Sequence, residues 1–418
     1  MKRNVLIVGL IMLIFFVISF LTNILGPIIP DLVDSFGLSI GLAGFLPFAF
    51  FVAYSASIPS GLLIERYREK PVLIGAFLLA FIGALCFALF PTFTIALISL
   101  FSIGVGMAML QVAINPLLRV AGGEEHFAFN SVLAQLFSGA ASFFSPLLYS
   151  YFVQTIHTRD TSFPIRLLNK LVPLHLEWVS LYWVFAATTL LMIVVVALIH
   201  FPVVTLKDDE RMEVGSAFRE LLRNKTVLLY FAGIFAYVGT EQGIANWISK
   251  FLQLYHGVDP ATTGATVVAY FWGLMTVGCM LGLVLLKIAD SRRVLMLFTI
   301  GAVGCLLTGL FGPKEWALYA LPGTGFFASV MWSIILSLGL NSVPHHHGTF
   351  SGILCTGIVG GALVPLLIGG LAELVGLRWA MLLLLITLGY IFSIGLWAKP
   401  LVNNATIKKV KELFVAND

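Results

Sequence analysis

Long apolar segments recur along the whole chain, and they constrain the fold more than any other feature of the sequence. Each is about 20 to 28 residues long, the length that a helix needs to cross the hydrocarbon core of a bilayer. With 59% hydrophobic and 11% charged residues, the chain has too little polar surface to face water on all sides. Twelve segments are therefore predicted as membrane-spanning helices: 5–30, 39–64, 71–91, 93–119, 127–153, 178–201, 225–252, 263–288, 292–311, 314–341, 347–373 and 377–398.

The distribution of basic residues predicts the orientation of these spans. If both chain ends are cytoplasmic, 18 of the 24 Lys and Arg residues fall on the cytoplasmic side and six outside. Cytoplasmic loops are enriched in positive charge, so we expect a multi-pass protein of the cytoplasmic (inner) membrane with both termini inside. Lys2 and Arg3 resemble the start of a signal peptide. No small-residue cleavage site follows before Pro30, so we expect an uncleaved first helix.

A charged connection divides the twelve spans into six and six. It contains the run from Lys207 to Arg211, which is typical of a solvated linker. The fold class is therefore predicted as an all-α membrane protein with twelve transmembrane helices in two pseudo-symmetric six-helix bundles. We expect an N-terminal six-helix bundle over 1–201, a cytoplasmic linker over 202–224, a C-terminal six-helix bundle over 225–399 and a cytoplasmic tail over 400–418.

Span 7 carries the most unusual polar group, with Glu241, Gln242 and Asn246 inside an apolar run. A charge at membrane depth is costly, so such residues usually line a water-filled path. Glu241 is the one acidic residue that can be placed well inside a predicted span. Gly239 and Gly243 are expected to let the helix unwind toward a cavity. The alternative is a protonated Glu241 that bonds a neighbouring helix.

Other spans carry side chains suited to a sugar. Asn and Gln amides donate and accept, as sugar hydroxyls do, and Trp and Tyr rings cover the apolar face of a pyranose. Gln111 and Asn115 lie one helical turn apart in span 4. Isolated serines such as Ser138 and Ser142 are expected to have structural roles. For Trp272 and Trp332, packing is the alternative to lining a cavity, and Asn115 alternatively accommodates a helix break before Pro116.

Two short charged loops stand at equivalent places in the two halves. The first runs from Gly61 to Pro71 between spans 2 and 3, and the second from Gly282 to Arg293 between spans 8 and 9. In each, a small residue allows close helix approach and the charges are able to latch the cytoplasmic face of the outward-facing form. The predicted latch residues of the first loop are Gly61, Glu65, Arg66, Arg68 and Lys70.

These features together resemble the major facilitator superfamily, with Glu65 in place of the usual Asp in the loop after span 2. Closer similarity is to the fucose–galactose–glucose symporter family. It covers both halves and rests on Gly104-x-Gly106, Gln111, Ala113 and Asn115-Pro116 in span 4, Ala134-Gln135 in span 5, Tyr237-Val-Gly239 and Trp247 in span 7, Ile335-Leu-Ser337-Leu in span 10, and Ser351-Gly and Ile358-Val-Gly-Gly-Ala-Leu-Val-Pro365 in span 11.

The resemblance implies a secondary active transporter with its cavity between the bundles, near the midplane. The resemblance implies that proton-coupled fucose carriers of the family use acidic residues in helices 1 and 4 for coupling. Here those positions fall near Asn23 or Gly26 and on Gln111, none of which is acidic. Glu241 is then the predicted coupling residue. The predicted substrate-binding residues are Asn23, Gln111, Asn115, Gln135, Tyr237, Glu241, Gln242, Asn246, Trp272 and Trp332.

The predicted partners are a neutral monosaccharide, expected to be a hexose, and the lipid bilayer, and we expect a monomer. We expect no enzymatic activity, no metal site and no cofactor, apart from a coupling proton or sodium ion. The sequence has no Walker motif, no zinc spacing and no nucleic-acid-binding patch. Three alternatives stay open: an uncoupled sugar facilitator, a carrier of a non-sugar solute, and a membrane sugar sensor that does not transport.

Overall fold

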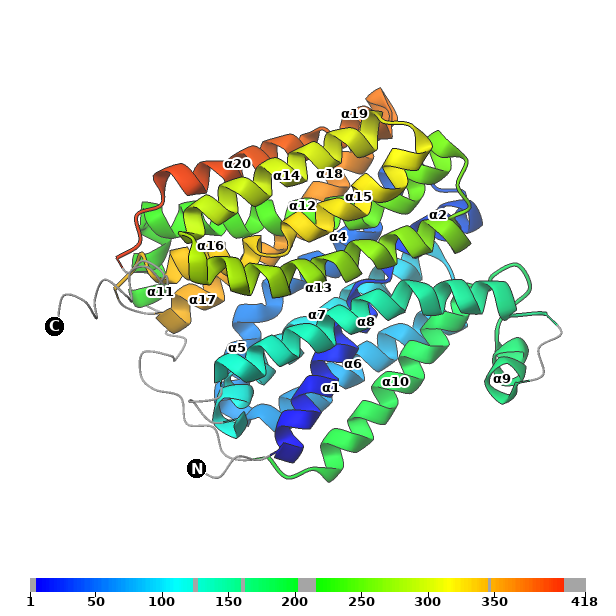
Figure 1. Cartoon of the computed structure of the whole chain (residues 1–418). Helices are drawn as coiled ribbons and strands as arrows, with labels where there is room; N and C mark the ends of the chain where they lie inside the picture. The colour runs from blue at the N-terminus through cyan, green and yellow to red at the C-terminus, as the bar shows by residue number, and fades with distance from the viewer. Residues whose placement is uncertain (1–4, 123–126, 159–161, 202–215, 345–346, 402–418) are drawn as a thin grey trace.

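The structure, a computed structural model, describes residues 5–122, 127–158, 162–201, 216–344 and 347–401. Regular secondary structure in these ranges is helical throughout, and twelve helical spans are long and apolar enough to cross a membrane. In Figure 1 the helices of the first half lie side by side below those of the second half. The predicted fold class, twelve helices in two bundles, is confirmed.

Several spans are built from more than one helix. The first bundle contains α1 (Val5–Thr22) and α2 (Leu25–Phe36), α3 (Ile40–Ala43), α4 (Phe45–Val52), η1 (Ala53–Ala56) and α5 (Ser57–Tyr67), α6 (Glu69–Leu89), α7 (Phe93–Gly122), α8 (Phe127–Thr155) and α10 (Val179–Leu198). The second contains α12 (Lys225–His256), η4 (Pro260–Gly264) and α13 (Ala265–Ile288), α14 (Ser291–Phe311), α15 (Lys314–Ala328) and α16 (Met331–Leu340), α17 (His347–Thr356), η5 (Gly357–Val359) and α18 (Gly360–Val375), and α19 (Leu377–Ala380) and α20 (Leu383–Trp397).

Two short connecting helices mark the two ends of the molecule. α11 (Ser216–Arg223) lies at one end, where α1 begins and α20 finishes (Figure 1). α9 (Phe163–Leu171) connects α8 to α10 at the other end. We refer to these as the α11 end and the α9 end. Most of the predicted linker and tail, 202–215 and 402–418, lies outside the described residues, so the domain boundaries stay predictions.

Prolines account for the interruptions in spans 1 and 2. Proline has no N–H, and its ring clashes with the carbonyl four residues earlier. The interruption between α1 and α2 falls at Asn23, four residues before Pro27. The interruption after Ala43, between α3 and α4, lies four residues before Pro47, and η1 precedes Pro59 in the same way. The sequence therefore places these breaks at defined depths in the first bundle.

Span 7 is continuous, so the prediction that its glycines unwind the helix is wrong. α12 runs without interruption from Lys225 to His256 and contains no proline. Its glycines instead allow close packing within the second bundle. A Cβ atom on Gly239 would lie 2.4 Å from Val364 Cγ2 of α18, and one on Gly243 would lie 2.8 Å from Leu384 Cδ2 of α20. Both positions therefore require glycine because a larger side chain would collide with the neighbouring helix.

Span 1 is longer than predicted. α2 continues to Phe36 and brings Asp31 into the membrane-length span that starts at Val5. The Tyr149 hydroxyl of α8 donates a hydrogen bond to the Asp31 carboxylate. Glu241 is therefore not the only carboxylate inside a span, which corrects the prediction. The error arose because Pro30 was taken as the end of the helix, whereas α2 continues through it.

One packing device is repeated in the two bundles at the α11 end. Lys70 Nζ, at the start of α6, donates to the carbonyl oxygens of Ala197 and Ile199 over 2.7 and 2.8 Å. Arg292 Nη1, at the start of α14, donates to Ala398 O over 3.3 Å. In each bundle a cation on the third span therefore satisfies carbonyls that the end of the sixth span leaves free.

Candidate functional site

Three polar side chains form a row in the middle of α12. Glu241 stands 16 residues after Lys225 and 15 before His256, the two ends of the helix. Gln242 Nε2 donates to Glu241 Oε1 over 2.9 Å, and Asn246 Nδ2 donates to Gln242 Oε1 over 3.3 Å. Gln242 and Asn246 are buried, whereas Glu241 is partly exposed. The structure therefore brings these three predicted site residues together at membrane depth.

Two aromatic residues extend this row toward α16. The Tyr237 hydroxyl, one turn before Glu241, donates a hydrogen bond to the Glu241 carboxylate. The ring of Tyr237 packs against that of Trp332 in α16, with centroids 6.0 Å apart and planes inclined by 57°. Trp332 is thus linked to Glu241 through one tyrosine. A change in the protonation or position of Glu241 would therefore act on Trp332 of α16 through Tyr237.

A cavity of about 380 Å³ lies between the bundles, with Gln135 of α8 on one side and α16 on the other. Its size falls within the range of small-molecule pockets. Ser333, Ser337 and Asn341 line it from α16 together with Trp332, Leu336 and Leu340. Asn341 Nδ2 lies 3.4 Å from Ser337 Oγ, and both residues are exposed.

Sequence reasoning missed Ser333, Ser337 and Asn341 as site residues, although Ser337 was part of the family resemblance. They stand at successive intervals of four residues, which places them on one face of a helix. That spacing in an otherwise apolar span was the available signal. Of the predicted residues, Gln135 and Trp332 share this cavity, and Tyr237 joins it through its contact with Trp332.

Asn23 is positioned at the break in span 1, where it bonds within its own bundle. Its Nδ2 donates to Ser142 Oγ over 2.7 Å, and Ser142 Oγ donates to Ser138 O over 2.8 Å. At the same break Ser145 Oγ donates to the carbonyl of Phe20 over 2.9 Å. Side chains of α8 thus satisfy groups that the broken helix frees. These contacts fit the structural roles expected for Ser138 and Ser142.

Three further predicted residues, Gln111, Asn115 and Trp272, belong neither to the described lining of this cavity nor to the polar row of α12. Gln111 is half-buried and forms no side-chain hydrogen bond with another described residue. Asn115 lies in α7, but its side chain is outside the described part of the structure. Trp272 is 6% exposed, and its indole Nε1 has no hydrogen-bond partner among the described residues. An unpaired buried donor costs about 1–3 kcal/mol, so Trp272 stays a candidate ligand-binding residue.

The bundles are in close contact from the middle of α12 toward the α9 end. A Cβ atom on Gly26 of α2 would lie 2.2 Å from Ala245 O of α12, which shows how closely these helices approach. The backbone N–H of Gly41 in α3 donates to Glu373 Oε1 of α18 over 3.0 Å. The cavity lined by Gln135 lies nearer the α11 end, because Gln135 is in the first third of α8. The α9 end is therefore closed by packing and by a polar contact.

A buried lysine adds to this closure. Lys250 of α12 is 5% exposed, and its Nζ donates to Gln253 Oε1 over 2.8 Å. The same Nζ lies 3.7 Å from Asp34 Oδ1 of α2. The ion pair joins helices of different bundles, so it must break if the bundles separate at this end.

No hydrogen bond or ion pair joins a described side chain of the predicted latch to the second bundle, although α5 itself contacts α17. Arg66 is exposed, and its guanidinium lies 5.3 Å from the ring centroid of neighbouring Tyr67. Arg68 has a φ angle of 67° in the tight turn between α5 and α6. Gly61 is buried, the side chain of Glu65 is outside the described part, and Lys70 bonds to carbonyls of its own bundle. The latch therefore stays a prediction.

Comparison with known proteins adds an independent observation. The family model of the Major Facilitator Superfamily matches residues 11–358. The glucose/galactose transporter of Brucella abortus biovar 1 (strain 9-941) is 29% identical over 397 residues, which cover 92% of this chain and 92% of the relative. The L-fucose-proton symporter of Escherichia coli (strain K12) is 25% identical over 385 residues, with 87% and 86% covered.

A solved structure shares the fold. The crystal structure of the E. coli fucose:proton symporter superposes with a TM-score of 0.68 at 21% identity. The superposition covers 95% of this chain and 100% of that one. The likeness extends over both bundles.

Proposed function

Because the chain belongs to the Major Facilitator Superfamily, we propose that it transports a neutral monosaccharide, a hexose, across the inner membrane. The observation that carries this proposal is the cavity between the bundles, where Gln135 of α8 faces the Ser333, Ser337 and Asn341 side of α16. The sugar-transporting relatives support the substrate class.

The cavity has the chemistry that a hexose requires. Gln135 and Asn341 each offer an amide that donates and accepts, and Ser333 and Ser337 offer hydroxyls. The indole of Trp332 supplies an apolar surface beside them. None of the residues that line this cavity is charged, so a neutral polyol fits it better than an anion or a cation does. The site therefore offers a hexose both contact with the Trp332 ring and several hydrogen-bonding groups.

The contacts between the bundles support an inward-facing state. Basic residues such as Arg66, Arg219 and Arg292 lie toward the α11 end, and positive charge favours the cytoplasmic side. The α11 end is therefore assigned to the cytoplasm, with both chain ends inside. Extensive packing toward the α9 end and a cavity nearer the α11 end, where α5 still contacts α17, then support access from the cytoplasm. To face outward, the bundles must separate at Gly26 and extend the contacts that α5 and α17 already form at the α11 end.

Glu241 is the coupling residue in this proposal. As a carboxylate it accepts hydrogen bonds from Tyr237 and Gln242. When Glu241 carries a proton, one of its oxygens becomes a donor, and the bonds from Tyr237 and Gln242 weaken because their acceptor is no longer charged. Tyr237 transmits this to Trp332 at the wall of the cavity. We favour a proton as the coupling ion, and the experiments also test a sodium gradient.

Uptake of radiolabelled glucose and galactose into proteoliposomes tests the function, with binding measured on the same preparation. We expect saturable uptake that an imposed proton gradient drives above equilibrium. Gln154→Ala is a matched control for Gln135→Ala, because Gln154 lies on α8 and bonds Ser150 of the same helix. Sugar binding without uptake would identify a sensor, and uptake that never exceeds equilibrium would identify a facilitator. Absence of both binding and uptake would contradict the sugar assignment.

A further inference from the structure

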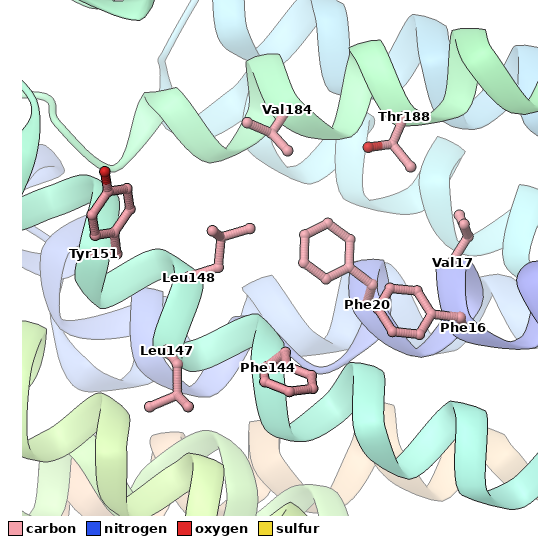
Figure 2. Close-up of a pocket in the computed structure, with 9 residues that line it drawn as sticks. All are labelled: Phe16, Val17, Phe20, Phe144, Leu147, Leu148, Tyr151, Val184 and Thr188. Atoms are coloured by element: carbon pink, nitrogen blue, oxygen red, sulfur yellow. The ribbon is translucent and has the colours of Figure 1, made fainter. Parts of the chain in front are cut away.

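A second cavity, of about 500 Å³, lies on the outer face of the first bundle. Figure 2 shows Phe20 of α1 facing Leu148 of α8 and Val184 of α10, with Phe16 beside Phe20. It does not contribute to the sugar cavity, which is lined by α8 and α16 only. We refer to it as the α1–α8–α10 groove; its lining residues are Phe16, Val17, Phe20, Phe144, Leu147, Leu148, Tyr151, Val184 and Thr188.

The groove opens toward the membrane. Phe137, Phe144 and Tyr151 of α8 are all exposed and stand seven residues apart, so they form one outward stripe along the helix. On α10, Leu191 and Val194 are likewise exposed. In a chain that spans a bilayer, such a surface contacts hydrocarbon. A groove lined by aromatic and aliphatic side chains within this surface suits a hydrocarbon chain better than water, since water has almost no polar partner there.

α9 supplies charge next to the groove. It connects α8 to α10, the two helices that form the groove walls, and it lies at their ends (Figure 1). Ile165 and Leu168 are buried, whereas Phe163, Leu167 and Leu171 are exposed along one side of the helix. An apolar stripe on a surface helix beside a membrane span is typical of a helix that lies in the interface.

Two basic side chains flank the apolar stripe of α9. Arg166 and Lys170 are one helical turn apart, and both are exposed. Neither forms an ion pair with a described residue. Cations on an interfacial helix attract anionic headgroups. The apolar groove and this charge therefore match the two parts of one amphiphile.

We propose that the α1–α8–α10 groove and α9 form a binding site for an anionic phospholipid of the surrounding leaflet. One acyl chain occupies the groove against Phe16 and Phe20. The phosphate of the headgroup binds at Arg166 and Lys170. Bound there, the lipid holds α8 and α10 together on the face away from the second bundle. Because α8 also carries Gln135, the site is next to the transport pathway while remaining separate from it.

Native mass spectrometry of the purified protein tests both parts of the site, with phosphatidylglycerol and phosphatidylcholine of equal chain length as probes. We expect preferential retention of phosphatidylglycerol. Lys170→Gln should weaken its retention roughly five-fold, because one cation near an anionic surface contributes about that factor. Lys314→Gln is the matched control, since Lys314 is an exposed cation that starts α15 in the other bundle. Equal retention of the two lipids, or equal loss in both variants, would overturn the headgroup assignment.

Filling the groove tests the acyl-chain part. Val184→Trp places an indole in the groove and should lower retention of both lipids, whereas Leu191→Trp on the exposed side of α10 should not. Size-exclusion chromatography shows that each variant is folded. If Val184→Trp elutes as a folded protein and retains phosphatidylglycerol like wild type, the groove does not hold the chain. Because the readout is lipid retention, failure here is distinguishable from failure of the proposed transport function.

Discussion

Spans 1 and 7 open the two bundles, and both extend over 32 residues, yet they are built differently. Span 1 is broken at Asn23, four residues before Pro27. Span 7 is one continuous helix that carries Glu241, Gln242 and Asn246 in a hydrogen-bonded row. The break in span 1 is fixed by side chains of α8, whereas span 7 contains no proline and its glycines pack closely against α18 and α20.

The difference suggests different roles for the two bundles in the proposed transport cycle. In the first bundle, prolines set the bends and Gly26 provides the surface against which α12 closes. In the second, a regular helix holds titratable and amide groups at fixed spacing, so that they bond one another. A transporter of two related bundles therefore does not need the same chemistry in both. The proposed coupling group, Glu241, lies in the bundle whose first helix stays intact.

The largest effect is expected where the two spans touch. Gly26→Ala introduces a Cβ atom 2.2 Å from Ala245 O, a backbone atom that has little room to move. Overpacking of this kind costs about 1–3 kcal/mol, and the cost falls on the closed α9 end. We expect transport to drop more than any sugar-site variant, together with slower alkylation of Ser337→Cys from the α11 end. Gly9→Ala is the control, because nothing lies within 4 Å of its Cβ position.

Amide variants test the contribution of the first bundle to the sugar site. Gln135→Ala should weaken sugar binding by about 1–3 kcal/mol, because a polar group of the bound sugar loses its partner. Gln111→Ala should do the same if the amide reaches the sugar when the bundles move. Gln154→Ala is the control on α8. Isothermal titration with glucose and galactose gives the affinities, and unchanged values for both Gln135 and Gln111 variants would place the first-bundle half of the site elsewhere.

Asn23 separates a structural from a binding role in span 1. Asn23→Ala removes the 2.7 Å bond to Ser142. We expect a loss of stability of about 0.5–1.5 kcal/mol, seen as a lower melting temperature, with sugar affinity nearly unchanged. Ser142→Ala should show the same stability change, since it removes the other partner. A fall in affinity at constant melting temperature would instead assign Asn23 to the sugar.

The smallest effect is expected at the predicted latch. Arg66→Ala should slow transport within about five-fold and leave equilibrium binding intact, because exposed ion pairs contribute roughly 0–1 kcal/mol. Lys70→Ala should lower stability as well, since Lys70 bonds two carbonyls at the end of span 6. Initial uptake rates and melting temperatures distinguish the two. An equal loss of rate and affinity in a folded Arg66→Ala protein would count against the latch.

The fold was predictable because the length of each apolar segment indicates a helix that crosses the bilayer. The polar row of α12 was predictable because amides and a carboxylate are costly in lipid. Other features depend on contacts between distant segments. Gly239 looks like a helix breaker in sequence, and only the position of Val364 shows that it serves packing. Asp31 was left out of the predicted span because Pro30 was taken as its end, and sequence alone does not show that α2 continues past Pro30 and meets Tyr149. Ser333 and Asn341 gained significance only when α16 was placed opposite Gln135.

The central claim, that span 7 carries the coupling group, is tested most directly by Glu241→Gln. This change keeps the shape and hydrogen-bonding capacity of the side chain but fixes it in the neutral state. Uptake and counterflow are measured in proteoliposomes for wild type and variant, with proton and sodium gradients imposed separately. We predict that the variant loses concentrative uptake but keeps sugar exchange between equal pools, because exchange does not require return of the empty carrier. Concentrative uptake by the variant equal to that of wild type would contradict the claim.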